Sequence, residues 1–247
     1  MGSREGYDAA RYGDEIADAY DDLPTHPQDA EAAAACLAGL TRPGPAPELA
    51  IGTGRIALPL ARRGVVVSGI DASEAMVAKL RAKPGGERIP VTIGDFADVD
   101  VDGRFALVFI VYNTFFALLD QASQQGCFRG VADHLAPGGR FVIEAFVPDV
   151  TRFERHQHVE VRHVGADAAM LSVSRHYPAA QRVDSLLVRL AHDGTSTWPV
   201  HIRYSYPSEL DLMAEQAGLR LEHRWGGWER EPYTDDSVRH VSVYEPS

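Results

Sequence analysis

Short apolar runs alternate with stretches of helical periodicity between residues 48 and 146, and this alternation limits the folds open to the chain. The apolar runs cover residues 48–51, 65–70, 89–93, 105–111 and 140–146, and the helical stretches cover 56–63, 73–82 and 121–135. Strands that alternate with helices at this spacing form βαβ units around a parallel sheet. The run at 105–111 is almost continuously apolar, as a strand buried on both faces requires. The sequence therefore predicts an α/β fold built on a parallel sheet.

The segments on either side of this region follow other patterns. Residues 4–22 carry tyrosines at positions 7, 12 and 20 among acidic residues, which favours one or two short helices. An Ala-rich helix is expected at 29–40, with Asp29 as its N-cap. From about 159 to 206 the pattern has period two, which predicts antiparallel strands inserted after the fifth strand. These strands are expected at 159–163, 170–176, 185–190 and 199–206, followed by a helix at 208–217 and closing strands at 219–225 and 240–244.

These patterns divide the chain into three parts. We expect a helical N-terminal lid at 1–42, a core domain formed by 43–150 and 207–247, and an antiparallel β insertion at 151–206. We expect the insertion to lie over the site where a second substrate binds.

The composition excludes some classes of function. The chain of 247 residues has a formal net charge of −11, which disfavours nucleic acid as a partner. It lacks a run of 18 apolar residues and begins with a polar, acidic segment, so we expect neither a membrane span nor a signal peptide. Cys36 and Cys127 cannot form a disulfide framework and have no metal-ligand spacing around them. We therefore expect a cytoplasmic protein, and the sequence leaves a homo-oligomer open.

A glycine turn follows the first apolar run. Residues 52–57 (Gly-Thr-Gly-Arg-Ile-Ala) match a G-x-G-x-x-A pattern between a predicted strand and a predicted helix. Glycines there let the backbone approach a ligand, and the free N–H groups of the following helix can bind an anion. By itself the pattern also fits a dinucleotide-binding protein.

Two acidic residues follow the next strands. Asp71 ends the second strand, where a carboxylate can accept hydrogen bonds from both ribose hydroxyls, although it also stands where a helix N-cap would. Gly94-Asp95-Phe96 follows the third strand, where a carboxylate beside an aromatic ring can bind adenine, unless Asp95 is an ordinary loop residue.

In this order, the motifs resemble those of class I S-adenosylmethionine-dependent methyltransferases. The resemblance covers about residues 45–147 and is carried by Glu48-Leu49-Ala50-Ile51-Gly52-Thr53-Gly54, Gly69-Ile70-Asp71-Ala72-Ser73-Glu74-Ala75-Met76, Gly94-Asp95-Phe96 and Leu135-Ala136-Pro137-Gly138-Gly139-Arg140-Phe141. One position departs from the family pattern, since Ala50 stands where the family has its first glycine. Alanine is small, so we expect cofactor binding to survive.

The resemblance implies a fold, a cofactor and its binding residues. The fold is a Rossmann-like seven-stranded sheet with helices on both faces, and the cofactor is S-adenosylmethionine. Glu48 would anchor the first loop, Asp71 would hold the ribose, and Asp95 with Phe96 would bind adenine. The remaining residues expected to contact the cofactor are Ala50, Gly52, Gly54, Ala72, Met76 and Val111.

The acceptor side is predicted from chemistry and from the same resemblance. Methyl transfer is an in-line displacement, so the enzyme mainly positions a nucleophile and excludes water. Aromatic faces attract both a sulfonium and a cationic amine. Tyr12 and Tyr20 lie two helical turns apart, and Phe116 follows the fourth strand, so we expect these three at the acceptor, although N-terminal tyrosines also pack as ordinary core. The chain resembles small-molecule N-methyltransferases of the amino-sugar and lincosamide type, which implies an amine acceptor from antibiotic or other secondary metabolism.

Other residues have two interpretations each. Glu144 in the fifth strand is either a base or a partner in a loop salt bridge, and the segment from Trp225 to Trp228 forms either a pocket wall or a β-bulge with core tryptophan. His158 and His163 have a spacing that a metal site can use, but no cysteine or Glu-x-x-His motif supports one, so we expect no metal.

Three rival functions remain at this stage. They are O- or C-methylation on the same fold, a nicotinamide-dependent dehydrogenase, and a catalytically silent cofactor-binding protein. O-methylation usually needs a base or a metal beside the acceptor, and no convincing candidate is present in the sequence.

Overall fold

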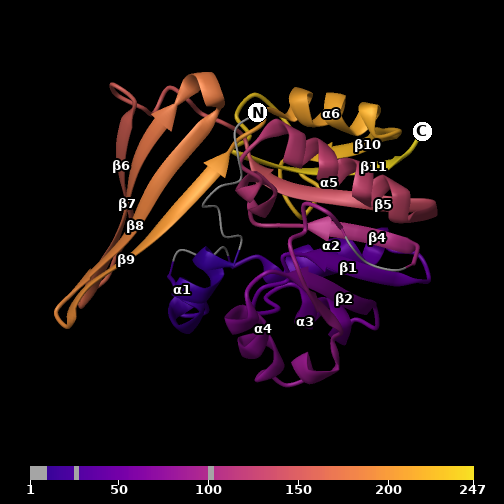
Figure 1. Cartoon of the computed structure of the whole chain (residues 1–247), viewed down its shortest axis with the longest axis horizontal. Coiled ribbons are helices and arrows are strands. Elements are labelled where there is room, and N and C mark those ends of the chain that lie inside the picture. The colour runs from indigo at the N-terminus through magenta and orange to yellow at the C-terminus, as the bar shows by residue number, and fades with distance from the viewer. Residues whose placement is uncertain (1–9, 25–27, 100–102) are drawn as a thin grey trace.

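A computed structural model describes residues 10–24, 28–99 and 103–247, which form two sheets and the helices around them (Figure 1). Tyr7 and the start of the helical segment expected at 4–22 lie outside the described residues. The large sheet has seven strands in the order β10-β11-β5-β4-β1-β2-β3. Its strands are β1 (Pro45–Leu49), β2 (Val66–Asp71), β3 (Val91–Ile93), β4 (Phe105–Ile110), β5 (Leu135–Phe146), β10 (Leu219–Trp225) and β11 (Arg239–Pro246). The first five are parallel and β11 pairs antiparallel with β5 and β10, so the predicted methyltransferase-type sheet is confirmed.

Helices cover both faces of this sheet (Figure 1). They are α1 (Arg11–Tyr20), α2 (Ala30–Leu40), α3 (Ala57–Arg62), α4 (Glu74–Arg81), α5 (Gln121–His134) and α6 (Pro207–Gln216), with short 3-10 turns η1 (Gly86–Arg88), η2 (Thr114–Ala117) and η3 (Pro178–Ala180). All six residues of β4 are buried. Val108 and Ile110 pack in the core under α5 and α6, whereas Leu107 and Phe109 pack under α2 and α3. A strand covered by helices on both sides must be apolar at every position.

The inserted sheet has four antiparallel strands in the order β6-β7-β8-β9. They are β6 (Gln157–Val164), β7 (Ala168–Tyr177), β8 (Arg182–Ala191) and β9 (Gly194–Arg203). The sheet extends away from the core domain, with α1 beside β9 (Figure 1). Met170 and Trp198 pack on Ile16 and Ala17 of α1, and the Trp198 indole donates a hydrogen bond to the Glu15 carbonyl at 3.2 Å. This small core holds α1 between the two sheets.

Two sequence-based boundaries were wrong. The strand expected at 140–146 is β5, which begins earlier, at Leu135, because Leu135 pairs with Phe105 at the start of β4. A Cβ on Gly139 would lie 2.6 Å from the Phe105 carbonyl oxygen, so close strand contact explains that glycine. The strand expected at 48–51 begins earlier as β1, at Pro45, a position that tolerates proline.

Within the described ranges, no helix is both long and apolar enough to cross a membrane.

Candidate functional site

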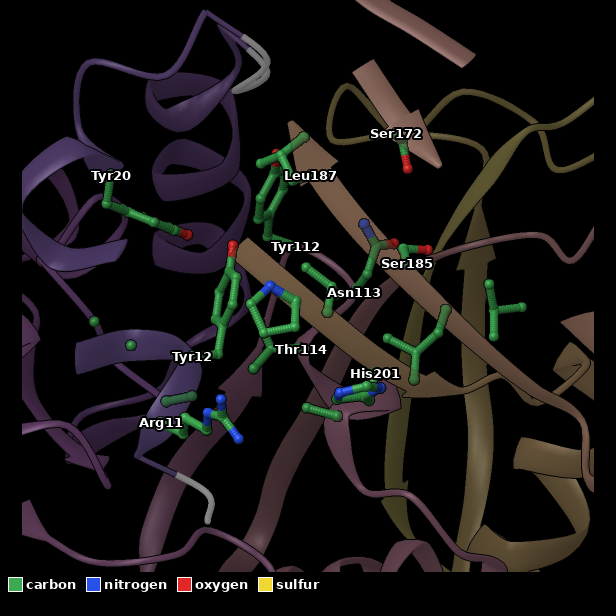
Figure 2. A pocket seen from close by; sticks show the side chains of 18 of the residues that line it. Arg11, Tyr12, Tyr20, Tyr112, Asn113, Thr114, Ser172, Ser185, Leu187 and His201 are labelled. Carbon is green, nitrogen blue, oxygen red and sulfur yellow. The ribbon is translucent and has the colours of Figure 1, made fainter. Parts of the chain in front are cut away.

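A cavity of about 580 Å³ lies at the carboxyl ends of the parallel strands, between the core domain, α1 and the inserted sheet. Ligands of open α/β sheets bind at this edge, and cavities of this size hold small molecules. Ala50 follows β1, Asp71 ends β2, and Tyr112 follows β4. Figure 2 shows Tyr12 and Tyr20 on one side of the cavity and Ser172 and Ser185 on strands across from them. The cavity therefore has a side formed by the core domain and a side formed by the insertion.

Only some of the glycine-loop residues that were predicted to contact the cofactor line the cavity. Ala50 and Gly52 both line the cavity and both have a φ of 56°, in the left-handed region. A Cβ on Gly52 would meet nothing within 4 Å, because that position opens into free space. Gly54 does not line it, and a Cβ there would lie 2.3 Å from Leu80 Cδ1. This glycine allows α4 to pack against the loop, and its contact with the cofactor stays a prediction.

Asp71 joins the glycine loop to the start of α4. Its Oδ2 accepts a hydrogen bond from Gly52 N at 2.7 Å, and its Oδ1 accepts one from Ser73 N at 2.8 Å. Burial raises the pKa of this carboxyl. The alternative helix-cap role falls to Ser73, whose hydroxyl accepts from Met76 N at 3.1 Å. Each carboxylate oxygen keeps a lone pair for a ligand hydroxyl, and Asp71 lines the cavity.

A smaller cavity of about 30 Å³ adjoins the first and shares Tyr20, Ala50 and Gly52 with it. Glu48 and Arg55 also line it. In the described part of the chain, Glu48 Oε2 and Arg55 Nη1 are buried without a hydrogen-bond partner, although Arg55 Nη1 lies 3.7 Å from Asp29 Oδ1. Burial raises the pKa of Glu48 well above its usual range. Buried polar groups normally have hydrogen-bond partners. Glu48 and Arg55 therefore form a site whose hydrogen bonds a ligand would complete.

Arg55 is the functional candidate that sequence analysis missed. Its guanidinium lies over the Tyr112 ring, 4.8 Å from the ring centroid, which fixes its position at the cavity. Its position directly after the second glycine of the loop was a signal that the sequence contained. That Arg55 lies near Glu48 could not be known without the fold.

The remaining predicted cofactor residues are placed as follows. Ala72, Met76 and Phe96 line the large cavity, and Val111 lines the small one. Asp95 lines neither cavity, and its Oδ1 accepts a hydrogen bond from Ala97 N at 2.9 Å. The alternative of a loop aspartate therefore fits Asp95, while its neighbour Phe96 faces the site.

Helix α1 closes one side of the cavity with Tyr12 and Tyr20, whose hydroxyl ends point toward the same region (Figure 2). Burial raises the pKa of both phenols, so both stay protonated at neutral pH. The helix is tied to α4, because Ser73 Oγ donates to Asp14 at 2.5 Å and Lys79 pairs with Asp18 at 2.7 Å.

A second tie lies at the end of α1. Lys83 pairs with Asp21 at 2.7 Å, and the Thr53 hydroxyl donates to the same carboxylate at 2.6 Å. Asp21 thus links the N-terminal segment to the glycine loop as well as to the end of α4.

The loop after β4 is held in an unusual conformation. Tyr112 and Asn113 have φ values of 58° and 64°, which cost side-chain-bearing residues energy. Glu144 Oε2 accepts from Tyr112 N at 2.5 Å, and Asn113 Oδ1 accepts from Phe146 N at 2.6 Å. Burial raises the pKa of Glu144, which does not line the cavity. Neither earlier interpretation of Glu144 is correct, since it fixes the loop that presents Tyr112 and Asn113.

Phe116 is in the hydrophobic core, not at the acceptor. It is fully buried, and its ring makes an edge-to-face contact with Phe146 at 5.0 Å between centroids. Phe146 lines the cavity in its place. The turn η2 directs the Phe116 ring into the core beside Phe115, so Phe116 does not line the cavity.

The inserted sheet contributes a row of small polar groups that the sequence analysis did not single out. Ser172, Ser174 and Ser185 line the cavity, with Ser174 Oγ and Ser185 Oγ 2.8 Å apart. Their period-two spacing was a usable signal, because alternate residues of a strand share one face.

The segment from Trp225 to Trp228 lies away from the cavity. Trp228 is buried in the core and Trp225 packs against the same cluster, so the pocket-wall alternative is wrong. The register shift between β10 and β11 lies at Leu221 and His223. Among the described residues, no group of three metal-binding side chains occurs.

Comparison with known proteins identifies relatives of the whole chain. Residues 47–139 match a family described as a methyltransferase domain. The CcbJ methyltransferase from Streptomyces caelestis is 39% identical, with a TM-score of 0.93 over 98% of this chain and 100% of the other. A cypemycin N-terminal methyltransferase from a Streptomyces species is 29% identical over 209 residues, 80% of this chain and 81% of the relative. The sugar N-methyltransferase KedS8 from a Streptoalloteichus species shares the fold, with 20% identity, a TM-score of 0.67 and coverage of 98% and 97%.

Proposed function

This chain belongs to the S-adenosylmethionine-dependent methyltransferases, and we propose that it methylates the amine of a small-molecule acceptor. The relative at 29% identity is named for methylation at an amino terminus, which supports nitrogen as the target atom. The same relative supports an acceptor from secondary metabolism, such as an antibiotic precursor. We also propose that residues 1–42 serve as the lid and 151–206 as the roof over the acceptor.

The residues of the two cavities fit the cofactor. Bound S-adenosylmethionine supplies a methyl group made electrophilic by its sulfonium. We assign the ribose to Asp71 and the adenine to the pocket formed by Phe96, Met76 and Ala72. Glu48 and Arg55, each of which has one buried atom without a hydrogen bond, complement the ammonium and carboxylate of the cofactor's amino-acid end, beside Ala50, Gly52 and Val111.

The name of the relative carries the choice of an amine, and the cavity's ionisable groups show what the hydroxyl alternative would require. The Asp71 carboxylate already accepts two backbone N–H groups and Glu160 is paired with Arg162, so His201, whose Nδ1 is held by Asp184, is the group that a hydroxyl acceptor would need as its base. The tyrosines stay protonated and cannot act as bases at neutral pH. A hydroxyl acceptor needs a base to become nucleophilic, whereas the neutral fraction of an amine carries its own lone pair.

Tyr12 and Tyr20 are the proposed catalytic residues. Their protonated hydroxyls can orient the amine, and their rings favour the positive charge that passes from sulfur to nitrogen. Replacing Tyr12 with phenylalanine removes one hydrogen bond, worth about 1 kcal/mol, so kcat should fall about fivefold. Unchanged kinetics would remove Tyr12 from this role.

The experiment pairs each candidate amine with its hydroxyl analogue. Purified protein is incubated with S-adenosylmethionine and either compound, and mass spectrometry follows the methylated product together with S-adenosylhomocysteine. We expect methylation of amines alone. Equal methylation of a hydroxyl analogue would refute the amine assignment and favour the O-methyltransferase alternative. Calorimetric titration with S-adenosylhomocysteine and with NAD tests the cofactor independently of the acceptor. Binding of NAD alone would refute the cofactor assignment.

A further inference from the structure

Asp29 stands directly before α2, at the N-cap position, but its side chain makes no capping hydrogen bond. Aspartate is favoured at this position because its oxygen can accept from the free N–H groups of the first helical turn. Both oxygens of the Asp29 carboxylate contact guanidinium groups from other parts of the chain instead. The carboxylate therefore serves contacts that the helix itself does not need.

The first of these guanidinium groups belongs to Arg239, whose Nη1 donates a hydrogen bond to Asp29 Oδ2. Arg239 begins β11 and pairs with Phe146 of β5, so it is fixed to the large sheet beside the cavity. The two side chains are 29% and 20% exposed, and solvent screens a partly buried ion pair less than an exposed one. Arg239 thus holds the carboxylate in place from the sheet.

The second guanidinium group belongs to Arg55, whose Nη1 lies 3.7 Å from Asp29 Oδ1. This separation is within the range of an ion pair but too long for a hydrogen bond. The Arg55 guanidinium also lies over the Tyr112 ring. Asp29 therefore attracts the guanidinium without using its N–H donors, and Nη1 has no hydrogen-bond partner among the described residues.

We propose that Asp29, held by Arg239, is a positioning residue that keeps Arg55 in place for the carboxylate of the cofactor. The inference rests on the assignment of Arg55 to that carboxylate in the proposed function. A binding group that is already in place does not have to be ordered by the ligand, which favours affinity. Asp29 also separates two guanidinium groups that would otherwise repel each other. Two arginines and one aspartate leave an excess of positive charge, which a ligand carboxylate can neutralise.

Two ligands separate positioning from a general effect on folding. S-adenosylhomocysteine has the amino-acid end of the cofactor, whereas methylthioadenosine keeps the adenosine and lacks that end. The variant Asp29→Asn keeps the size of the side chain and its capacity to cap a helix. In calorimetric titrations it should bind S-adenosylhomocysteine about threefold to tenfold more weakly, as coupling within one ion-pair network implies. Its affinity for methylthioadenosine should change by less than about twofold, because the adenosine is assigned to other residues.

Glu31→Gln is the matched control. Glu31 lies in the first turn of the same helix and pairs with Arg62 at 3.0 Å and Arg63 at 2.7 Å, so the variant also removes a carboxylate that has two arginine partners. It should bind both ligands as the wild-type protein does, because this exposed cluster is outside both cavities. In an Arg55→Gln background, Asp29→Asn should cause no further loss of affinity, because the aspartate acts through that arginine.

The wild-type protein should bind S-adenosylhomocysteine more tightly than methylthioadenosine. Equal binding of the two ligands would refute the assignment of Arg55 and overturn this inference with it. If the wild-type preference is present and Asp29→Asn retains it in full, the inference alone is overturned. A loss of equal size for both ligands, or a further loss in the Arg55→Gln background, would also overturn it.

A second variant applies if Asp29→Asn fails to fold. Arg239→Gln leaves the aspartate in place but removes the group that holds it. This variant should bind S-adenosylhomocysteine about twofold to fivefold more weakly, with unchanged binding of methylthioadenosine. An unchanged ratio of the two affinities in this variant would overturn the inference.

Discussion

Replacing Gly54 with alanine tests the packing role that the structure gives this glycine. Its φ of 77° is left-handed, which costs alanine about 1–2 kcal/mol. The added Cβ would lie 2.3 Å from Leu80 Cδ1 and 3.3 Å from Leu58 Cγ. Leu80 is fully buried, so it cannot move away freely, and overpacking of this kind costs about 1–3 kcal/mol. The expected loss in the free energy of unfolding is therefore about 2–5 kcal/mol.

Thermal and urea unfolding measure this loss. For a chain of this size each kcal/mol lowers Tm by about 2–4 °C, so Tm should fall by about 4–20 °C. Binding of S-adenosylhomocysteine, measured well below Tm, should change by less than about threefold, because Gly54 lines neither cavity.

Gly52→Ala is the matched control, since it introduces the same methyl group in the same loop. Its φ of 56° carries the left-handed cost, but a Cβ there meets nothing within 4 Å and enters the space assigned to the cofactor. This variant should lose only about 1–2 kcal/mol of stability but bind S-adenosylhomocysteine at least about fivefold more weakly. The reasoning is refuted if Gly54→Ala keeps its Tm and loses binding, because that result would return Gly54 to the cofactor site.

Three further predictions concern charged or ionisable groups. Arg55→Gln should weaken S-adenosylhomocysteine binding about 10- to 150-fold, as loss of a charged hydrogen bond of about 1.5–3 kcal/mol implies, and an unchanged Kd by calorimetry would contradict its assignment. Lys83→Met removes the ion pair with Asp21, so S-adenosylhomocysteine should dissociate about twofold to fivefold faster in stopped-flow measurements, with less dependence on salt. Burial lowers the pKa of His240 to about 3, against about 6.5 in the unfolded chain, so the unfolded state binds a proton that the folded state does not. The free energy of unfolding should then drop by about 2–3 kcal/mol between pH 7 and pH 4.5 because of His240. Urea titrations of His240→Gln should show a pH dependence that is smaller by this amount. Equal pH dependence of the two proteins would contradict the lowered pKa.

The sheet was predictable because its signals are local in the sequence. The apolar run at 105–111 and the period-two segment from 159 set the strand type and the buried face without knowledge of neighbours. The position of Asp71 was predictable for a similar reason, because the last residue of a parallel strand lies at the carboxyl edge of the sheet, where ligands bind.

The positions of some predicted site residues could not be read from the sequence. A glycine admits close approach by a ligand or by a packed side chain, and the motif does not distinguish these two roles for Gly54. The direction of Phe116 depends on the η2 turn, whose geometry the apolar pattern does not encode. Glu48 and Arg55 come to the same small cavity only where the end of β1 meets the start of α3.

The alternation along β7 and β8 gives neighbouring residues separate tasks. Ser172 and Ser185 face the cavity, while Val173 and Leu186 face outward on the next position of each strand. A substitution at one set can change the lining of the cavity without altering the outward face, and a substitution at the other can change the outward face without altering the cavity. The shape of the cavity and the character of the exposed face are thus separable traits, each open to selection or engineering through its own register of the same strands.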